Sequence, residues 1–210
     1  MNDPAGPRVA PLPREQWDDE VRDAIGSGFP EGVKARFLST GPDAMRVPNA
    51  IATFMHHPAL TGPWLNYNAQ LLQRPSLDPR HRELVVLRAA WRAKQEYEWV
   101  QHIRIAKRLQ FSDAEIEAVT KGAAGGEWSP LEADLLIAAD ELLDDFRISD
   151  ATWTRLSESL DVKQLIELVF VVGTYTALAM VFNSLGIQLD PDLDPASGPQ
   201  IPPHSPPHST

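Results

Sequence analysis

Hydrophobic positions along the chain recur at helical spacing. No stretch of alternating apolar and polar residues is long enough to predict a sheet. Trp17, Val21 and Ile25, for example, mark one face of a first helix that stops at the glycines of Gly26-Ser27-Gly28. The fold class is therefore predicted to be all-α. The expected helices with assignable bounds are 17–25, a short one at 34–38, 48–55, 58–73, 79–93, 95–109, 130–143 and 162–185.

Capping signals support these helices and predict two shorter ones. Asp78 precedes Pro79, a pair that suits the start of a long helix. The segment Ser112-Asp113-Ala114-Glu115 is a capping box for a short helix, and Ser149 caps another that contains Trp153 and Leu156. We expect Asp161 to cap the last helix and Gly186 to close it.

The composition divides the chain into an arm, one domain and a tail. Residues 1–12 are rich in proline and predict an extended arm. Residues 13–189 are expected to form a single all-α domain. Residues 190–210 carry seven prolines and two histidines, His204 and His208, and this composition predicts a disordered tail.

One helix is apolar on nearly all sides. The stretch 168–182 has 15 residues without a charge, fewer than the roughly 20 that cross a bilayer. We therefore expect it to be buried in a core or between subunits, and we expect no membrane partner. The N-terminal region has no apolar run after its basic residues, so no secretory signal is predicted and the expected location is the cytoplasm.

Two features of composition narrow the chemistry. The chain has no cysteine, which excludes thiolate nucleophiles, Cys-ligated zinc and dithiol redox chemistry. Its formal charge of -10 argues against nucleic acid as a partner, because phosphate binding needs a basic surface. Catalysis would have to use carboxylates, imidazoles, hydroxyls or a bound cofactor.

The charges are unevenly spread. Residues 80–108 contain eight Lys or Arg and three Glu, whereas residues 112–161 contain 13 Asp or Glu and three Lys or Arg. Two interpretations stay open: both segments present solvated faces, or the basic helix pair lines a pocket for an acidic ligand while the acidic segment covers the outer surface.

The segment with the most candidate chemistry contains Glu83, Glu98 and His102. Glu98 and His102 are four residues apart and can touch on one helix face, although such pairs are often surface salt bridges. Glu83 lies among Leu and Val residues of the preceding helix, where a carboxylate needs a partner. The repeated Glu-x-x-His of a di-iron bundle does not occur, so we expect no metal.

The pattern Arg82-Glu83-Leu84-x-x-Leu87-Arg88, followed by Tyr97-Glu98-Trp99-x-x-His102, resembles the carboxymuconolactone decarboxylase family with its AhpD-like proteins. Weaker similarity extends over most of residues 8–189. The resemblance implies an all-α fold whose central two-helix hairpin packs against neighbouring subunits, as a homo-oligomer that we expect to be a trimer or a hexamer. The redox branch of the family has cysteines at the positions of Gln95 and Glu98, so peroxide reduction by disulfide exchange is excluded.

What remains is similar to the decarboxylase branch, which the resemblance implies needs no cofactor. On this basis His102 is the candidate acid, and Glu83, or Glu98 from the next turn, would orient it. Tyr97 could donate a hydrogen bond to a substrate carbonyl. Arg88 could bind a substrate carboxylate, or it could only pair with Glu83. The other candidate substrate-binding residues are Gln95 and His57.

The expected function is cofactor-free acid–base catalysis on a small acidic lactone or oxo acid. The alternatives are a non-catalytic oligomer that binds a small molecule, and a cofactor-free isomerase or cyclase using the same pocket. An enzyme should present Glu83 and His102 to a shared cavity, whereas a scaffold should bury them as a closed salt bridge.

Overall fold

The computed structural model describes residues 6–203, and within them the chain is all-α, with ten α-helices, two short 3-10 helices and no strand. The predicted fold class is confirmed in this respect. Residues 1–5 of the expected arm lie outside the described residues, as do residues 204–210 of the tail with His204 and His208.

Within the stretch 13–189, for which a single all-α domain is predicted, the helices gather into two compact units. Among the described residues, one unit comprises 6–75 together with Ser184–Asp190, and the other comprises Ser76–Asn183 together with 191–203. The division arises because the helices before Pro75 close a hydrophobic core of their own, which includes Trp17, Ile25 and Met55.

The first unit holds four helices, and α1 packs against α4 within it. Arg46 Nη1 lies 2.7 Å from Asp190 Oδ1, and the same oxygen accepts from the backbone N–H of Asn49. These contacts bind the segment Ser184–Asp190 to the rest of the first unit. Its helices are α1 (Asp19–Ile25), α2 (Glu31–Leu38), α3 (Asn49–Phe54) and α4 (Pro58–Gln73), after a 3-10 turn η1 (Arg14–Gln16).

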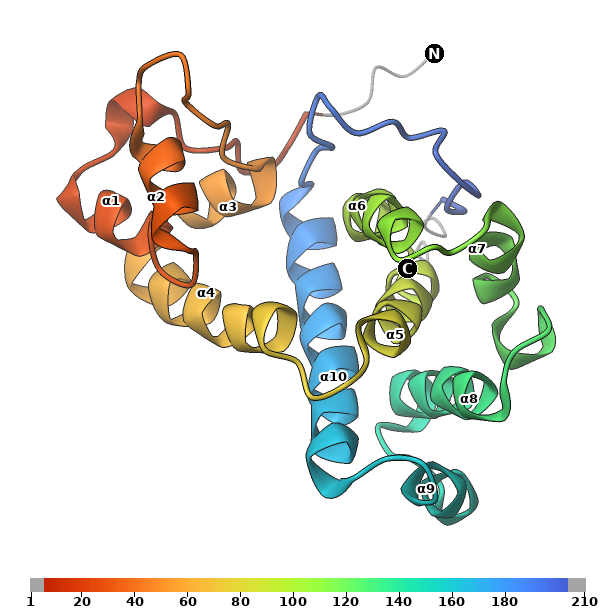
Figure 1. Ribbon diagram of the computed structural model, residues 1–210. Coiled ribbons are helices and arrows are strands. Elements are labelled where there is room, and N and C mark those ends of the chain that lie inside the picture. Colours follow the sequence, from red (N-terminus) through yellow and green to blue (C-terminus); the bar gives the residue numbers. More distant parts are fainter. Residues whose placement is uncertain (1–5, 204–210) are drawn as a thin grey trace, which may run out of the picture. The chain divides into compact units, whose positions relative to one another are not determined.

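The second unit is built around a helical hairpin. In it α5 packs against both α6 and α8 (Figure 1). The turn between α5 and α6 is tight, with Lys94 in the left-handed region at φ 52°. The elements of this unit are α5 (Pro79–Arg92), α6 (Glu96–Arg108), α7 (Asp113–Val119), η2 (Gly122–Ala124), α8 (Pro130–Asp145), α9 (Asp150–Ser157) and α10 (Val162–Leu185), the last of which ends in the first unit.

The predicted caps are confirmed. Ser112 forms the predicted capping box with Glu115, and the structure shows a second box, of Ser129 with Glu132, that was not predicted. The Asp78 side chain accepts from the N–H of Arg80 at the start of α5. Gly186 follows α10 with φ 68°, the left-handed conformation that ends many helices.

Helix α10 has a buried side and an exposed apolar side. The helix has 24 residues and spans the predicted range of 162–185. It is long and apolar enough to cross a membrane, and half of its most apolar window is buried, as in the core helix of a folded domain. Its exposed large apolar side chains are Val162, Ile166, Val169, Phe170, Met180 and Val181.

The basic residues of α5 pair with the acidic residues of α7 and α8. Arg80 contacts both Glu115 and Glu132, and Arg92 contacts Asp140 at 2.6 Å and Asp144 at 2.6 Å. The basic and acidic segments therefore form ion pairs that link helices of the same unit. This differs from both interpretations of the sequence pattern, because each of these bases already has an acid of the same chain beside it.

Residues 191–203 have no helix or strand, but they lie against α6. The indole N–H of Trp99 donates to the carbonyl of Pro199 at 2.7 Å, and Lys107 donates to the carbonyl of Ser197 at 3.1 Å. Arg104 pairs with Asp192 at 2.8 Å. This part of the expected disordered tail thus packs against α6. Its backbone forms no helix or strand, and side chains of α6 donate hydrogen bonds to its carbonyl groups instead.

Candidate acid–base site

The α5–α6 hairpin brings His102 and Glu83 together. The two residues are 19 positions apart, on adjacent helices, and His102 Nδ1 lies 2.6 Å from Glu83 Oε1. Glu83 has no exposed surface and the His102 side chain is 5% exposed. The hairpin turn sets this contact, because it folds α6 back along α5 in the register that places the two side chains opposite each other.

A second carboxylate holds the other ring nitrogen. His102 Nε2 lies 3.1 Å from Glu98 Oε2, the contact expected between residues four apart on one helix. The Gln95 side chain caps α6 by accepting from the backbone N–H of Glu98 at 2.5 Å, which fixes the turn that carries Glu98. The ring of His102 is therefore held between carboxylates from two helices.

These carboxylates determine the charge of His102. Burial alone lowers the pKa of His102, but the negative charges and hydrogen bonds of Glu83 and Glu98 outweigh burial and raise the pKa from 6.5 to about 10. At neutral pH the ring is therefore an imidazolium, and each of its N–H groups donates to one carboxylate.

Tyr175 of α10 completes the cluster, and the sequence analysis missed it. Its ring packs edge-on against the His102 ring, with the centroids 4.9 Å apart and an interplanar angle of 87°. Burial, followed by the charges of Glu98 and Glu83, raises the pKa of the Tyr175 hydroxyl well above 10. The sequence signal that could have indicated Tyr175 is its place within an apolar helix, since a buried tyrosine hydroxyl usually has a polar neighbour.

The arginine of the cluster is Arg82 rather than Arg88. Arg82 Nη2 lies 3.6 Å from Glu83 Oε2, and the Arg82 side chain is 8% exposed. Arg88 instead forms two bonds to Asp140, at 2.7 and 2.9 Å, and donates to the carbonyls of Val119 and Thr120. Five residues separate Arg88 from Glu83, about 140° around the helix, so the two side chains leave α5 in different directions.

The other predicted residues have structural places. Tyr97 is buried with its ring edge-on to Phe182, 5.4 Å between centroids. Gln95 is buried at the cap of α6, and His57 is exposed at the N-cap of α4, in the other compact unit. The structure thus brings Glu83, Glu98 and His102 into one cluster, and it places neither Arg88 nor His57 in it.

The arrangement can store and move a proton. Across residues 6–203 no group of three or more His, Asp or Glu side chains is arranged to hold a metal ion. The side chains of Glu83, Glu98 and His102 are 0%, 8% and 5% exposed, so the cluster is closed within the chain. This closure is the feature expected of a scaffold, whereas the pairing of one imidazole with two carboxylates is a feature of acid–base sites.

A protein-family model matches the segment that contains this hairpin. The sequence model of the carboxymuconolactone decarboxylase family matches residues 58–141, a segment that contains Glu83, Glu98 and His102. No curated protein matches the chain in sequence.

Solved structures share the fold. An uncharacterised peroxidase-related protein from a Silicibacter species is 15% identical, with a TM-score of 0.70 over 92% of this chain and 97% of the other. An uncharacterised peroxidase-related protein with an AhpD core, from Ralstonia eutropha, is 17% identical, with a TM-score of 0.68 over 90% and 95% of the two chains. A debrominase in complex with 2,3,4-tribromopyrrole is 15% identical, with a TM-score of 0.65 over 91% and 94%.

These three proteins show the fold of the chain, while the match over residues 58–141 covers the hairpin with its Glu83–His102 pair. The positions at which the redox branch carries its cysteines hold Gln95 and Glu98. Residues 58–141 of this cysteine-free chain therefore match the carboxymuconolactone decarboxylase family, and the solved structures show that the chain shares the AhpD-like fold.

Proposed function

We propose that the chain is an enzyme that uses cofactor-free acid–base catalysis on a small acidic lactone or oxo acid. One observation carries the proposal: the imidazole of His102 is held between Glu83 at 2.6 Å and Glu98 at 3.1 Å. A proton held in this way is stored at a defined atom, which is the requirement for a general acid.

The two carboxylates have different roles in this proposal. Glu83 has no exposed surface and fixes Nδ1, so it orients the ring. Glu98 covers Nε2 and is the more exposed of the two, which makes Nε2 the atom that delivers the proton. When a substrate atom takes the place of Glu98, His102 loses one negative neighbour. Its pKa then falls towards neutrality, and the proton becomes easier to give away.

The proposed reaction is a decarboxylation. The bond between the carboxylate carbon and its neighbour breaks, CO₂ leaves, and the electron pair passes to the adjacent carbonyl as an enolate. The enolate carbon then takes the proton from His102 Nε2, and water restores that proton through Glu98. Arg82, which contacts Glu83, is the cation nearest this chemistry and would stabilise the enolate oxygen.

A non-catalytic small-molecule-binding protein is the second candidate. The observation that favours it is the closure of the cluster, whose side chains are at most 8% exposed. A buried ion cluster of this kind can fix the packing of two helices without doing chemistry.

In either case we propose a homo-oligomer, a trimer or a hexamer. The support is the exposed apolar side of α10, where Val162 is 71% exposed, Met180 is 63% exposed and Phe170 is 54% exposed. Several large apolar side chains left exposed on one helix are typical of protein interfaces.

The test is turnover by matched variants. The purified protein is incubated with lactone acids and 3-oxo acids, whose carbonyl can take the electron pair as an enolate, and released CO₂ is measured. Because one protein of similar fold is a debrominase with a bromopyrrole bound, flat ring acids are included in the panel. The variants are His102→Ala, Glu83→Gln and Glu98→Gln, with Glu96→Gln as the control, since Glu96 is exposed on the same helix.

We expect His102→Ala to lower turnover by about 10²–10⁴-fold, the usual contribution of general acid–base catalysis. Glu96→Gln should leave turnover unchanged. Release of CO₂ that is the same in wild type and His102→Ala would end the proposal. A compound that raises the melting temperature without being turned over would favour the second candidate.

A further inference from the structure

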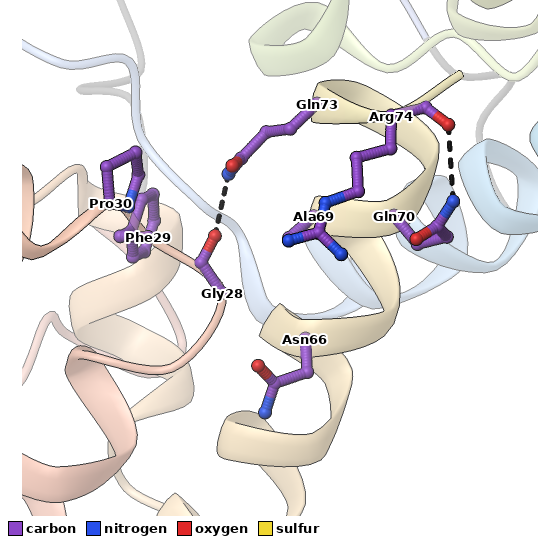
Figure 2. A pocket seen from close by; sticks show the side chains of 8 residues that line it. All are labelled: Gly28, Phe29, Pro30, Asn66, Ala69, Gln70, Gln73 and Arg74. Carbon is purple, nitrogen blue, oxygen red and sulfur yellow. Dashed lines mark hydrogen bonds between the residues drawn. The ribbon is translucent and has the colours of Figure 1, made fainter.

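A hollow in the first unit has no part in the proposed chemistry. It lies between the turn at Gly28, Phe29 and Pro30 and the last turns of α4 (Figure 2). Its volume is about 470 Å³, within the range of small-molecule sites. The polar groups around it define what kind of molecule fits.

One cation reaches into the hollow. The Arg74 side chain turns back from the end of α4, so that its guanidinium lies between Gln73 and Asn66 (Figure 2). Within residues 6–203 this guanidinium forms no hydrogen bond or ion pair. Among the described residues that line the hollow there is no Asp or Glu. The hollow therefore offers a planar pair of donors and a positive charge that no carboxylate of its own neutralises.

Three carboxamide side chains line the hollow together with this cation. The amide nitrogen of Gln73 donates to the carbonyl of Gly28 at 2.6 Å, that of Gln70 to the carbonyl of Arg74 at 3.2 Å, and that of Asn66 to the carbonyl of Gly62 at 3.3 Å. Because each amide nitrogen has a main-chain partner, the side-chain oxygens of all three are left as acceptors. They suit a ligand that brings hydrogen-bond donors of its own.

The walls of the hollow are held in place. Gly28 has φ 75°, and a Cβ there would lie 2.2 Å from the carbonyl oxygen of Leu65, so the turn can approach α4 only with glycine. The ring of Phe29 packs edge-on against Phe37, with centroids 5.1 Å apart. An apolar wall thus faces the polar groups on α4, which is the usual composition of a small-molecule site.

We infer that this hollow binds a small hydroxylated carboxylic acid. The carboxylate pairs with the guanidinium of Arg74, and hydroxyl groups donate to the oxygens of Asn66, Gln70 and Gln73. The carbon skeleton lies against Phe29. The site is separate from the His102 cluster, which belongs to the other compact unit.

Titration calorimetry with three probes tests both halves of the inference. D-Gluconate carries a carboxylate and hydroxyls, sorbitol carries hydroxyls alone, and acetate carries a carboxylate alone. We expect gluconate to bind in the millimolar range or tighter, and sorbitol and acetate to bind at least tenfold more weakly. Acetate binding as well as gluconate would overturn the role of the hydroxyls, and no binding of gluconate would overturn the inference.

Variants locate the binding. Arg74→Gln should weaken gluconate binding about tenfold or more, because it removes a charge-assisted pair. Asn66→Ala should weaken gluconate and leave acetate unchanged. The matched control is Arg22→Gln, since Arg22 is an exposed arginine on α1 away from the hollow, and its binding should equal wild type. An equal loss in Arg22→Gln and Arg74→Gln would show general electrostatic attraction instead of a site.

Discussion

Replacing Glu83 by glutamine tests whether the cluster is held together by charge. Glu83 has no exposed surface, its Oε1 is 2.6 Å from His102 Nδ1, and its Oε2 is 3.6 Å from Arg82 Nη2. Glutamine has nearly the same shape and keeps an oxygen that can accept from Nδ1. The substitution therefore removes one negative charge. The positive charges of His102 and Arg82 then remain, with Glu98 as the carboxylate left in the cluster.

The expected cost follows from the burial of the pair. Removing one partner of a buried ion pair destabilises a protein by roughly 3–5 kcal/mol, because the other charge stays buried without compensation. Since Glu98 still contacts His102 at 3.1 Å, we expect the lower end, about 3 kcal/mol. In a protein of this size about 1 kcal/mol shifts the melting temperature by roughly 2–4 °C, so Glu83→Gln should melt about 6–12 °C lower.

The assay is guanidinium and thermal unfolding of wild type, Glu83→Gln, His102→Ala and the double variant at pH 7. The double variant should lose less stability than the sum of the single losses, because each single change leaves a charge that the double change removes. Glu96→Gln, on the exposed side of α6, is the control and should stay within about 0.5 kcal/mol of wild type. Single losses that are small, or that add, would refute a charge-coupled cluster.

Three further predictions follow from the same structure and sequence. The pKa of His102 is about 10 in the folded protein, against an ordinary value of 6.5. The ion pairs of His102 with Glu83 and Glu98 therefore contribute their full stability below about pH 6.5, and this stability is lost as the pH rises to 10. Guanidinium unfolding across this range should show the loss in wild type and not in His102→Ala. Light scattering should give a mass well above the 23.3 kDa of one chain, and a mass near that value would contradict the proposed oligomer. With no cysteine, the protein should not reduce an alkyl hydroperoxide with a dithiol; turnover above a heat-killed control, after removal of haem and metal, would contradict this.

The sequence by itself determined the helices and their ends. Helix starts depend on residues within one turn, so the capping box of Ser112 with Glu115 and the cap at Ser149 could be recognised directly, and the structure has both. The contact between Glu98 and His102 was also available from the sequence, because four residues bring two side chains to one helix face.

The pairing of Glu83 with His102 came from a longer pattern. The interval of 19 residues is meaningful only if a hairpin folds two helices together, and the resemblance of this segment to the family supplied that expectation. The cost of burying a lone carboxylate among Leu and Val residues pointed in the same direction. The structure adds the contacts of both carboxylates with the ring, which outweigh burial and raise the pKa of His102 to about 10.

Only the tertiary structure decided which distant groups meet. Arg88 bonds to Asp140, 52 residues away, and the ring of Tyr175 comes to His102 from the last helix. Periodicity gives the face on which a side chain lies, but it does not give the helix that will cover that face. For the same reason the sequence could not place the hollow at Arg74, whose walls come from segments about 45 residues apart and meet because Gly28 lets the chain pass close to α4.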